Sequence, residues 1–170
     1  EGAIFFDLEK LSNNSINLPH MIPEKEKFIN FAKNNGLNHD DEIIIYDQEG
    51  FFSSTRVWFT FMFFGFQKIK VLNGGIKKWN ELKLPTTKIV KKNNKTNFYL
   101  RSIASNYIIG KEELEKIIFN KKNNTKIIDA RPKNRFLGIV EEPRPNLIKG
   151  NIHSNSVEDG ICKGLDLYLG

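Results

Sequence analysis

The fold is decided by the stretch IIIYDQEGFFSSTRVWFTFMFFGFQKIKVLNGG, residues 43–75. Residues 43–47 form a continuous apolar run closed by an acid, which is typical of a strand buried on both faces in a parallel sheet. Residues 55–64 are rich in aromatic side chains and predict a mostly buried helix. Residues 69–72 predict a second strand, so the spacing favours an α/β sheet with right-handed crossovers.

The chain on either side of this stretch has the same character. Further elements are expected as a strand edge at residues 3–7, helices at residues 24–34, 76–82 and 111–119, and a strand at residues 126–129. Residues 89–97 are polar and basic, which predicts an interdomain linker. We therefore expect a first domain at residues 1–88 and a second at residues 98–170, each a mostly parallel sheet flanked by helices.

Composition narrows the possible functions of the chain. A hydrophobic fraction of 39% is sufficient for a packed core, and no apolar run approaches the roughly 18–20 residues of a membrane span. The net charge of +6 comes from lysines interspersed with asparagines. These runs lack the aromatic residues that a nucleic-acid surface needs, so they indicate solvated loops. Cys162 is the only cysteine, which excludes an intrachain disulfide and favours a reducing compartment.

A second informative stretch is IIDARPKNRFLGIVEEPRPNLIKGNIH, residues 127–153. A short apolar strand leads into a proline-stiffened loop with three arginines, Arg131, Arg135 and Arg144. Guanidinium groups bind carboxylates and sulfur oxyanions through two parallel hydrogen bonds, so this loop indicates an anion site. The alternative is a solvated loop whose arginines pair with the carboxylates of the same stretch.

His20 is a further candidate because it lies in the segment LPHMIP, residues 18–23, with a proline on each side. The prolines stiffen the backbone and favour a fixed direction for the imidazole ring. The alternative is a loop histidine that is bonded to a nearby carboxylate such as Glu9.

Several motifs occur together in a recognisable order. They are GAIFFD at residues 2–7, LPHMIP at 18–23, YDQEGFFSSTRVW at 46–58, VLNGG at 71–75, and IDAR to GNIH across 128–153. In this order the chain resembles the two-domain rhodanese family of thiosulfate and 3-mercaptopyruvate sulfurtransferases. The resemblance covers most of residues 2–153.

The resemblance implies a tandem of rhodanese-like α/β domains with a persulfide-forming cysteine in the second. The first domain of such proteins has no nucleophile, and Asp47 stands at the corresponding strand end here. The implied reaction moves sulfane sulfur from 3-mercaptopyruvate, or thiosulfate, through a cysteine persulfide to a thiol or cyanide acceptor.

The resemblance also assigns roles to individual residues. Arg135 and Arg144 match positions that bind the substrate anion, and Arg144 resembles the mercaptopyruvate branch more closely. His20 and Glu9 match a histidine and acid that assist proton transfer, although the acid is usually aspartate. Arg131 is then expected to be a structural partner of nearby carboxylates.

Cys162 has two interpretations under this resemblance. In one it heads the persulfide loop and is the catalytic cysteine. In the other, Gly160-Ile161-Cys162 matches a stretch just after the nucleophile, which then lies outside this sequence. The short distance from His153 to the chain's end, and an incomplete second sheet, lead us to expect a fragment or a splice of ordered pieces. A plain buried thiol is a third, weaker possibility.

The expected partners and alternatives follow from the same residues. No metal or organic cofactor is expected, because no Cys/His cluster is present. The expected partners are a small anionic sulfur donor and a thiol acceptor, such as a thioredoxin-like protein or a small thiol, with no nucleic acid or membrane. The expected location is cytoplasmic or mitochondrial. The main alternative is a catalytically inactive rhodanese-like binding or regulatory module.

Overall fold

The computed structural model shows two compact units, residues 1–107 and residues 108–170. It describes residues 2–15, 20–48, 50–90, 92–119, 124–130, 132–137 and 139–140. Among these residues, no helix has the length and apolar character that crossing a membrane would require.

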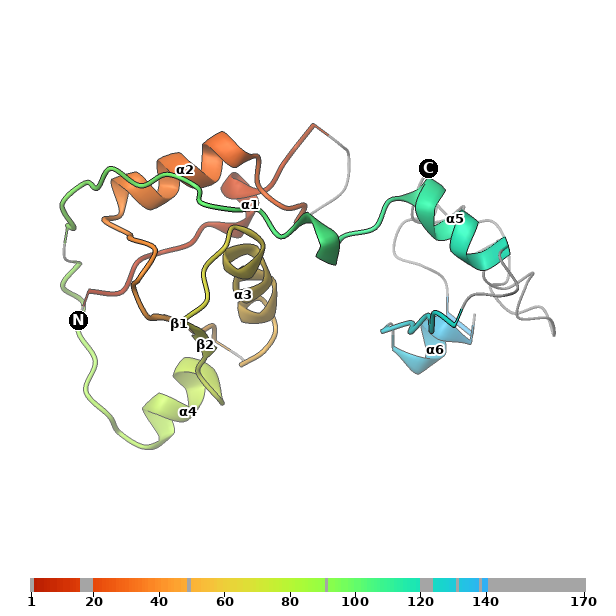
Figure 1. The fold of residues 1–170 in the computed structure, drawn as a ribbon. Coiled ribbons are helices and arrows are strands. Elements are labelled where there is room, and N and C mark those ends of the chain that lie inside the picture. Colours follow the sequence, from red (N-terminus) through yellow and green to blue (C-terminus); the bar gives the residue numbers. More distant parts are fainter. Residues whose placement is uncertain are drawn as a thin grey trace. The chain divides into compact units, whose positions relative to one another are not determined.

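The first unit is built around two parallel strands (Figure 1). Strand β1, Ile43–Ile45, pairs with β2, Ile69–Val71, in a register that places Ile44 opposite Lys70. Helix α3, Ser54–Phe63, connects the strands and packs on both of them. The predicted strand, helix and strand are therefore confirmed.

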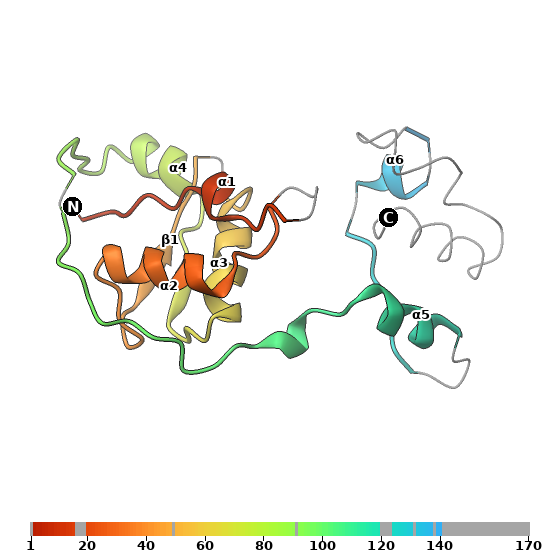
Figure 2. The ribbon, with the colours of Figure 1, turned by 90° about the horizontal axis from the view of Figure 1, so that it is seen from above.

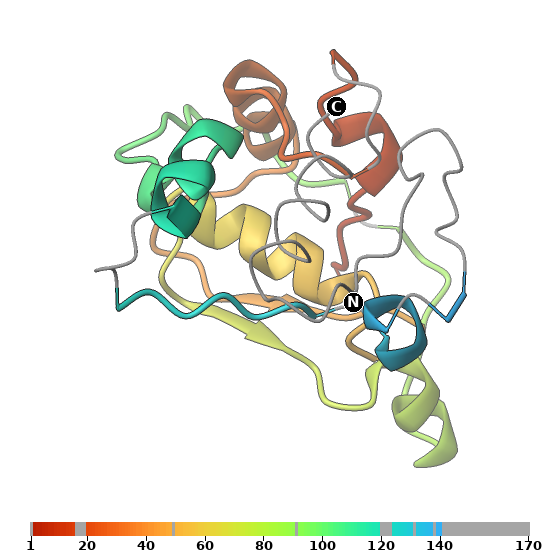
Figure 3. The same cartoon turned by 90° about the vertical axis from the view of Figure 1, so that its right-hand side faces the viewer.

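The remaining helices of the first unit surround this core. Helix α1 spans Leu8–Leu11, α2 spans Lys25–Asn34, and α4 spans Gly75–Glu81. A short 3-10 turn, Ser105–Tyr107, closes the unit. Helix α3 lies between α2 and the two strands (Figures 1 and 3), so its aromatic side chains are enclosed from two sides.

The core of the first unit is a cluster of phenylalanines. Phe28 of α2 is fully buried and stacks on Phe64 with ring centroids 4.1 Å apart. Phe66 stacks on Phe98 with ring centroids 5.7 Å apart. Aromatic pairs of this kind contribute about 0.5–1.5 kcal/mol beyond their buried area. Of the aromatic run predicted to be core, Phe61 and Phe64 are buried, and Trp58 and Phe63 are partly buried against the cluster.

The first unit extends beyond the boundary expected from the sequence. Residues 92–97 of the expected linker, 89–97, run along the first unit, where the backbone N–H of Thr96 donates to the Lys33 carbonyl at 3.0 Å. The Thr96 hydroxyl also donates to the Leu37 carbonyl at 2.8 Å. Phe98, expected to open the second domain, is 3% exposed in the core of the first. Apolar Phe98 is held there because it completes the phenylalanine cluster.

Three expected strand features differ in the structure. Ile44, expected to be buried, is 59% exposed because its side chain lies on the face of β1 opposite to Ile43 and Ile45, which pack in the core. Residues 3–7 are extended but do not form a strand. Residues 126–129 likewise form no strand, and Ile128 is 87% exposed. A strand requires a backbone ladder with a neighbouring strand, and among the described residues the one ladder joins β1 and β2.

The second unit contains two described helices. Helix α5, Lys111–Phe119, has the bounds expected from the sequence. Helix α6, Lys133–Phe136, lies in the arginine-rich stretch, and its first residue follows Pro132. Proline fixes its own φ near the helical value, so it favours a helix start at this point.

Candidate functional site

The loop after β1 is organised by the side chain of Asp47. One carboxylate oxygen accepts hydrogen bonds from the backbone N–H groups of Phe52, Ser53 and Ser54, at 2.9, 2.8 and 2.9 Å. The other accepts from the Gly50 N–H. These groups converge at the N-terminus of α3, where the helix dipole also favours negative charge. Asp47 therefore fills a ring of backbone donors that would suit an anion.

The ionisation of Asp47 reflects these contacts. Desolvation by burial acts to raise its pKa, but the backbone N–H groups of Ser54, Gly50 and Ser53 outweigh burial, so the pKa is lowered from its ordinary 3.8. The carboxylate is consequently ionised at neutral pH. The loop at the end of β1 therefore carries a fixed anion.

Gly75 closes the other side of this loop. Its φ is +56°, and a Cβ at this position would lie 2.4 Å from the Asp47 carbonyl oxygen. The same carbonyl accepts from the Ile76 N–H at 2.9 Å. A side chain at Gly75 would be strained in conformation and would displace the backbone of Asp47.

We expect Asp47→Ala to lower the free energy of unfolding by about 1–3 kcal/mol at pH 7, because it leaves the backbone N–H donors of the loop without an acceptor. Since the folded pKa is lowered, this contribution is present above the unfolded value of 3.8 and is lost as the pH falls through the folded pKa. Urea unfolding at pH 7 and near pH 2 measures the change. If the free energies of unfolding of the wild type and Asp47→Ala differed as much near pH 2 as at pH 7, this role of the Asp47 charge would be contradicted.

His20 is exposed, and Arg56 of α3 holds its backbone. The guanidinium of Arg56 donates a hydrogen bond to the His20 carbonyl oxygen. His20 has a φ of +56°, an uncommon conformation for a residue with a side chain. Burial lowers the pKa of the half-buried Arg56, which nevertheless stays charged at neutral pH. No role for Arg56 was expected from the sequence, in which it is the one charged residue among the aromatic residues of α3.

Glu9 lies on α1 and is exposed. The first turn of this helix is capped by Asp7, whose carboxylate accepts from the Lys10 N–H at 3.1 Å. In the described part of the chain, no hydrogen bond or ion pair joins Glu9 to His20. In this structure Glu9 and His20 are therefore paired neither as the predicted proton-transfer pair nor as the alternative hydrogen-bonded pair.

Arg135 lies on α6 in the second unit and is half-buried. Arg131, Arg144 and Cys162 fall outside the described residues. The roles of Arg135, Arg144, Cys162, His20 and Glu9 therefore remain predictions. Among the described residues, no group of three or more His, Cys, Asp or Glu side chains could hold a metal ion.

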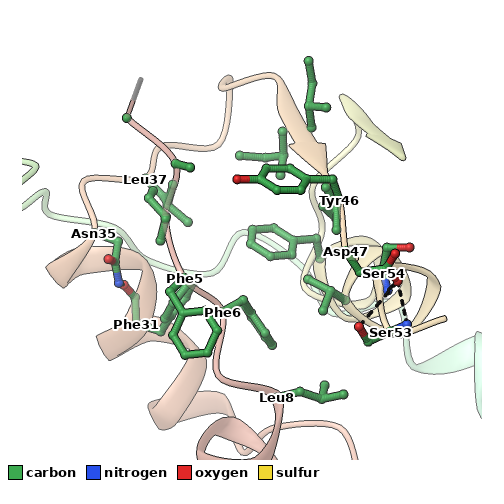
Figure 4. Close-up of a pocket in the computed structure, with 18 of the residues that line it drawn as sticks. Phe5, Phe6, Leu8, Phe31, Asn35, Leu37, Tyr46, Asp47, Ser53 and Ser54 are labelled. Carbon is green, nitrogen blue, oxygen red and sulfur yellow. Dashed lines mark hydrogen bonds between the residues drawn. The ribbon is translucent and has the colours of Figure 1, made fainter. Parts of the chain in front are cut away.

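A groove of about 970 Å³ lies beside the Asp47 loop in the first unit. One wall is the extended segment of residues 2–6, and the other is β1 with the residues that follow it. Figure 4 shows Phe5 and Phe6 on one side and Tyr46 and Asp47 on the other. The groove is mainly apolar, and Asp47, Ser53 and Ser54 of the strand-end loop also line it.

The first unit is thus an α/β domain with a parallel sheet. The loop that follows its strand β1 is organised by an acid, Asp47. Residues 2–82 match the rhodanese-like domain family. Residues 2–82 are therefore a rhodanese-like domain, and the resemblance seen in the sequence is confirmed.

Named relatives extend this match into the second unit. The chain is 35% identical over 153 residues to 3-mercaptopyruvate sulfurtransferase of Escherichia coli K12, covering 89% of this chain and 53% of that protein. It is 30% identical over 156 residues to the human enzyme of the same name, covering 89% and 50%. The chain thus spans about half the length of these relatives.

Two solved structures have the same fold. The crystal structure of SseA from Escherichia coli, a 3-mercaptopyruvate sulfurtransferase, matches with a TM-score of 0.73 and 31% identity, over 84% of this chain and 53% of that one. The Tum1 protein of Saccharomyces cerevisiae matches with a TM-score of 0.74 and 29% identity, over 85% and 50%.

Proposed function

We propose that the full-length protein is a sulfurtransferase that takes sulfur from 3-mercaptopyruvate. The observation that carries this proposal is the 35% identity to the Escherichia coli enzyme over 89% of the chain. The match continues beyond the first unit, so it includes the stretch that holds Arg135. Thiosulfate is the alternative donor, since a relative from Arabidopsis thaliana, 33% identical, is named for both substrates.

The chemistry requires a thiolate, an anion site and a proton donor. In the proposed reaction, a cysteine thiolate attacks the sulfur of 3-mercaptopyruvate, and the carbon–sulfur bond breaks with its electron pair remaining on carbon. The resulting pyruvate enolate takes up a proton, and the enzyme keeps a persulfide. A second thiolate, the acceptor, then attacks the outer sulfur and releases the cysteine.

We assign the anion site to Arg135 and Arg144, since two guanidinium groups suit a carboxylate next to a carbonyl. Cys162 is the proposed sulfur carrier, and His20 with Glu9 is the proposed route for the proton. The first unit would serve as the non-catalytic half. Asp47 supports this division, because its carboxylate occupies the donors at the strand end.

The proposed partners are a small anionic sulfur donor and a thiol acceptor, either a small thiol or a thioredoxin-like protein. A cytoplasmic or mitochondrial location is proposed with them. The Arabidopsis thaliana relative named as mitochondrial supports the second of these compartments.

The donor preference is tested by comparing pyruvate release from 3-mercaptopyruvate with sulfite release from thiosulfate, using the full-length protein and one thiol acceptor. We expect a higher kcat/KM with 3-mercaptopyruvate. Faster turnover of thiosulfate would reverse the donor assignment. No turnover of either donor would favour the alternative, an inactive binding or regulatory module.

Arg56 is expected to act as a positioning residue for His20. Arg56→Ala should lower kcat about tenfold, because one charged hydrogen bond is lost. Arg56→Lys should restore part of the lost kcat. Hydrogen exchange at the amides of residues 20–22 should accelerate in Arg56→Ala. The matched control is Arg101→Ala, because Arg101 is exposed and only weakly paired with Asp40, at 3.7 Å. If Arg56→Ala changed neither the hydrogen exchange of these amides nor the pH profile of kcat, this role of Arg56 would be contradicted.

A further inference from the structure

The turn that follows β2 contains an asparagine joined directly to a glycine. Two such pairs occur in the sequence, Asn35-Gly36 and Asn73-Gly74. Asparagine before glycine is prone to spontaneous loss of its side-chain amide, because glycine has no Cβ that would keep its backbone nitrogen away from the asparagine side chain. The surroundings of the two pairs differ, and this difference indicates which of them reacts.

The pair Asn73-Gly74 is open to water. Asn73 is exposed, and it lies in a turn at residues 72–75 that is closed by the Gly75 N–H donating to the Leu72 carbonyl at 3.1 Å. Gly74 has a φ of +81° at the third position, which is typical of a type II turn. Within the described part of the chain, no hydrogen bond involves the Asn73 side chain or the Gly74 N–H. Neither of the two groups that would react is therefore held by another described residue.

The pair Asn35-Gly36 is held by its neighbours. The half-buried Asn35 donates from its side-chain amide to the Phe31 carbonyl at 2.8 Å. The Gly36 N–H donates to the Lys33 carbonyl at 3.3 Å, and the Asn35 carbonyl accepts from the Asn93 side chain at 3.0 Å. These bonds must break before the Asn35 side chain can meet the Gly36 nitrogen. The second pair is therefore an internal control for the first.

The turn after β2 also borders the loop that Asp47 organises. The Asp47 carbonyl accepts from the Ile76 N–H at 2.9 Å. A Cβ on Gly50 would lie 3.1 Å from the carbonyl carbon of Gly74. A Cβ on Gly74 would lie 2.5 Å from the Lys78 Cβ. The backbones of the turn and the loop are thus in close contact, and an additional backbone atom in the turn would displace one against the other.

We propose that Asn73 is a site of spontaneous deamidation, and that its isoaspartate product loosens the Asp47 loop. The Gly74 backbone nitrogen loses its proton and attacks the side-chain carbonyl carbon of Asn73. A carbon–nitrogen bond forms there, the side-chain nitrogen leaves as ammonia, and a cyclic imide results. Water then opens the imide at either carbonyl, giving aspartate or isoaspartate. This inference is independent of the proposed sulfur transfer.

The two products have different effects on the turn. Aspartate at position 73 adds a negative charge and leaves the backbone path unchanged. Isoaspartate arises when water attacks the backbone carbonyl, so the chain then runs through the former side chain and is longer by one carbon atom. This longer backbone would move Gly74 against Gly50 and weaken the bond from the Ile76 N–H to the Asp47 carbonyl.

Peptide mass spectrometry tests the proposal on full-length protein kept in mildly alkaline buffer for several weeks. The tryptic peptide of residues 71–77 has Asn73 as its only asparagine, and Asn35 lies in the peptide of residues 34–56. We expect Asn73 to convert about tenfold faster than Asn35, because the hydrogen bonds around Asn35 must first open. A protein isoaspartyl methyltransferase, added as a probe, should methylate residue 73 in the aged protein and not in the fresh protein.

Two variants separate the effects of charge and backbone length. Asn73→Gln should leave the peptide of residues 71–77 unchanged on ageing, because the longer side chain would have to form a larger ring. Asn73→Asp supplies the charge without the longer backbone, so its Ile76 amide should exchange hydrogen at the wild-type rate. In the isoaspartate fraction of the aged wild type, the same amide should exchange about tenfold faster.

Three results would overturn the proposal. Conversion at Asn35 that is as fast as at Asn73 would show that the local hydrogen bonds do not select the site. An intact Asn73, under conditions in which a synthetic peptide of residues 69–77 is converted, would show that the folded turn prevents the reaction. Unchanged exchange of the Ile76 amide in the isoaspartate fraction would show that the Asp47 loop is not affected.

Discussion

Replacing Phe28 by alanine should remove a large part of the stability of the first unit. Phe28 is fully buried, and its ring contacts those of Phe31, Phe61, Phe64, Phe66 and Phe98. Truncating a buried phenylalanine costs about 3–5 kcal/mol, through lost transfer energy and the cavity that remains. This loss is comparable to the total stability of a small domain, about 5–15 kcal/mol.

Urea unfolding followed by tryptophan fluorescence measures this loss, since Trp58 and Trp79 both lie in the first unit. Phe52→Ala is the matched control, because that side chain is 84% exposed and should change stability by less than about 0.5 kcal/mol. A loss below about 1 kcal/mol for Phe28→Ala would mean that the phenylalanine cluster does not hold the unit together.

Replacing Arg135 by alanine should lower kcat/KM for 3-mercaptopyruvate about 100-fold in the full-length protein. The proposed contact is a guanidinium holding the substrate carboxylate, and losing one partner of such a pair costs about 2–5 kcal/mol. Arg135→Lys should recover only part of the loss, because an ammonium group keeps the charge but lacks the planar fork.

The control for this prediction lies on the same short helix. Lys133 is an exposed cation two residues before Arg135 on α6, so Lys133→Ala tests general electrostatics at that position. Steady-state kinetics on the three variants separate the effects. Equal losses in Lys133→Ala and Arg135→Ala would indicate a nonspecific charge effect, and the substrate-binding role of Arg135 would then be wrong.

The elements of the fold were predictable where local patterns decide them. The helix expected at residues 55–64 is α3, Ser54–Phe63, and the one at 111–119 is α5, Lys111–Phe119. Strong periodicity and clear end signals fix such helices locally. Exposure of Ile44 was not predictable, because a β-branched run shows strand character but not which of its faces is covered. The packing of Phe98 on the first unit was missed because polar residues around it resemble a linker.

The candidate site was predictable only in part. The acid at the strand end, Asp47, was found through the resemblance, but its four backbone donors depend on the path of the loop after β1. Arg56 was missed because a hydrogen bond to a distant backbone carbonyl leaves no mark in the sequence. Arg144 and Cys162 stay predictions, since both lie outside the described residues.

We propose that this chain is part of a sulfurtransferase that works through a cysteine persulfide. The most direct measurement is peptide mass spectrometry of the full-length protein after treatment with 3-mercaptopyruvate and no acceptor. We predict one added sulfur atom on the peptide that contains Cys162, lost again when a thiol is supplied, with pyruvate released in equal amount. Sulfur on a different cysteine would move the nucleophile outside this sequence. No added sulfur on any cysteine would contradict the claim.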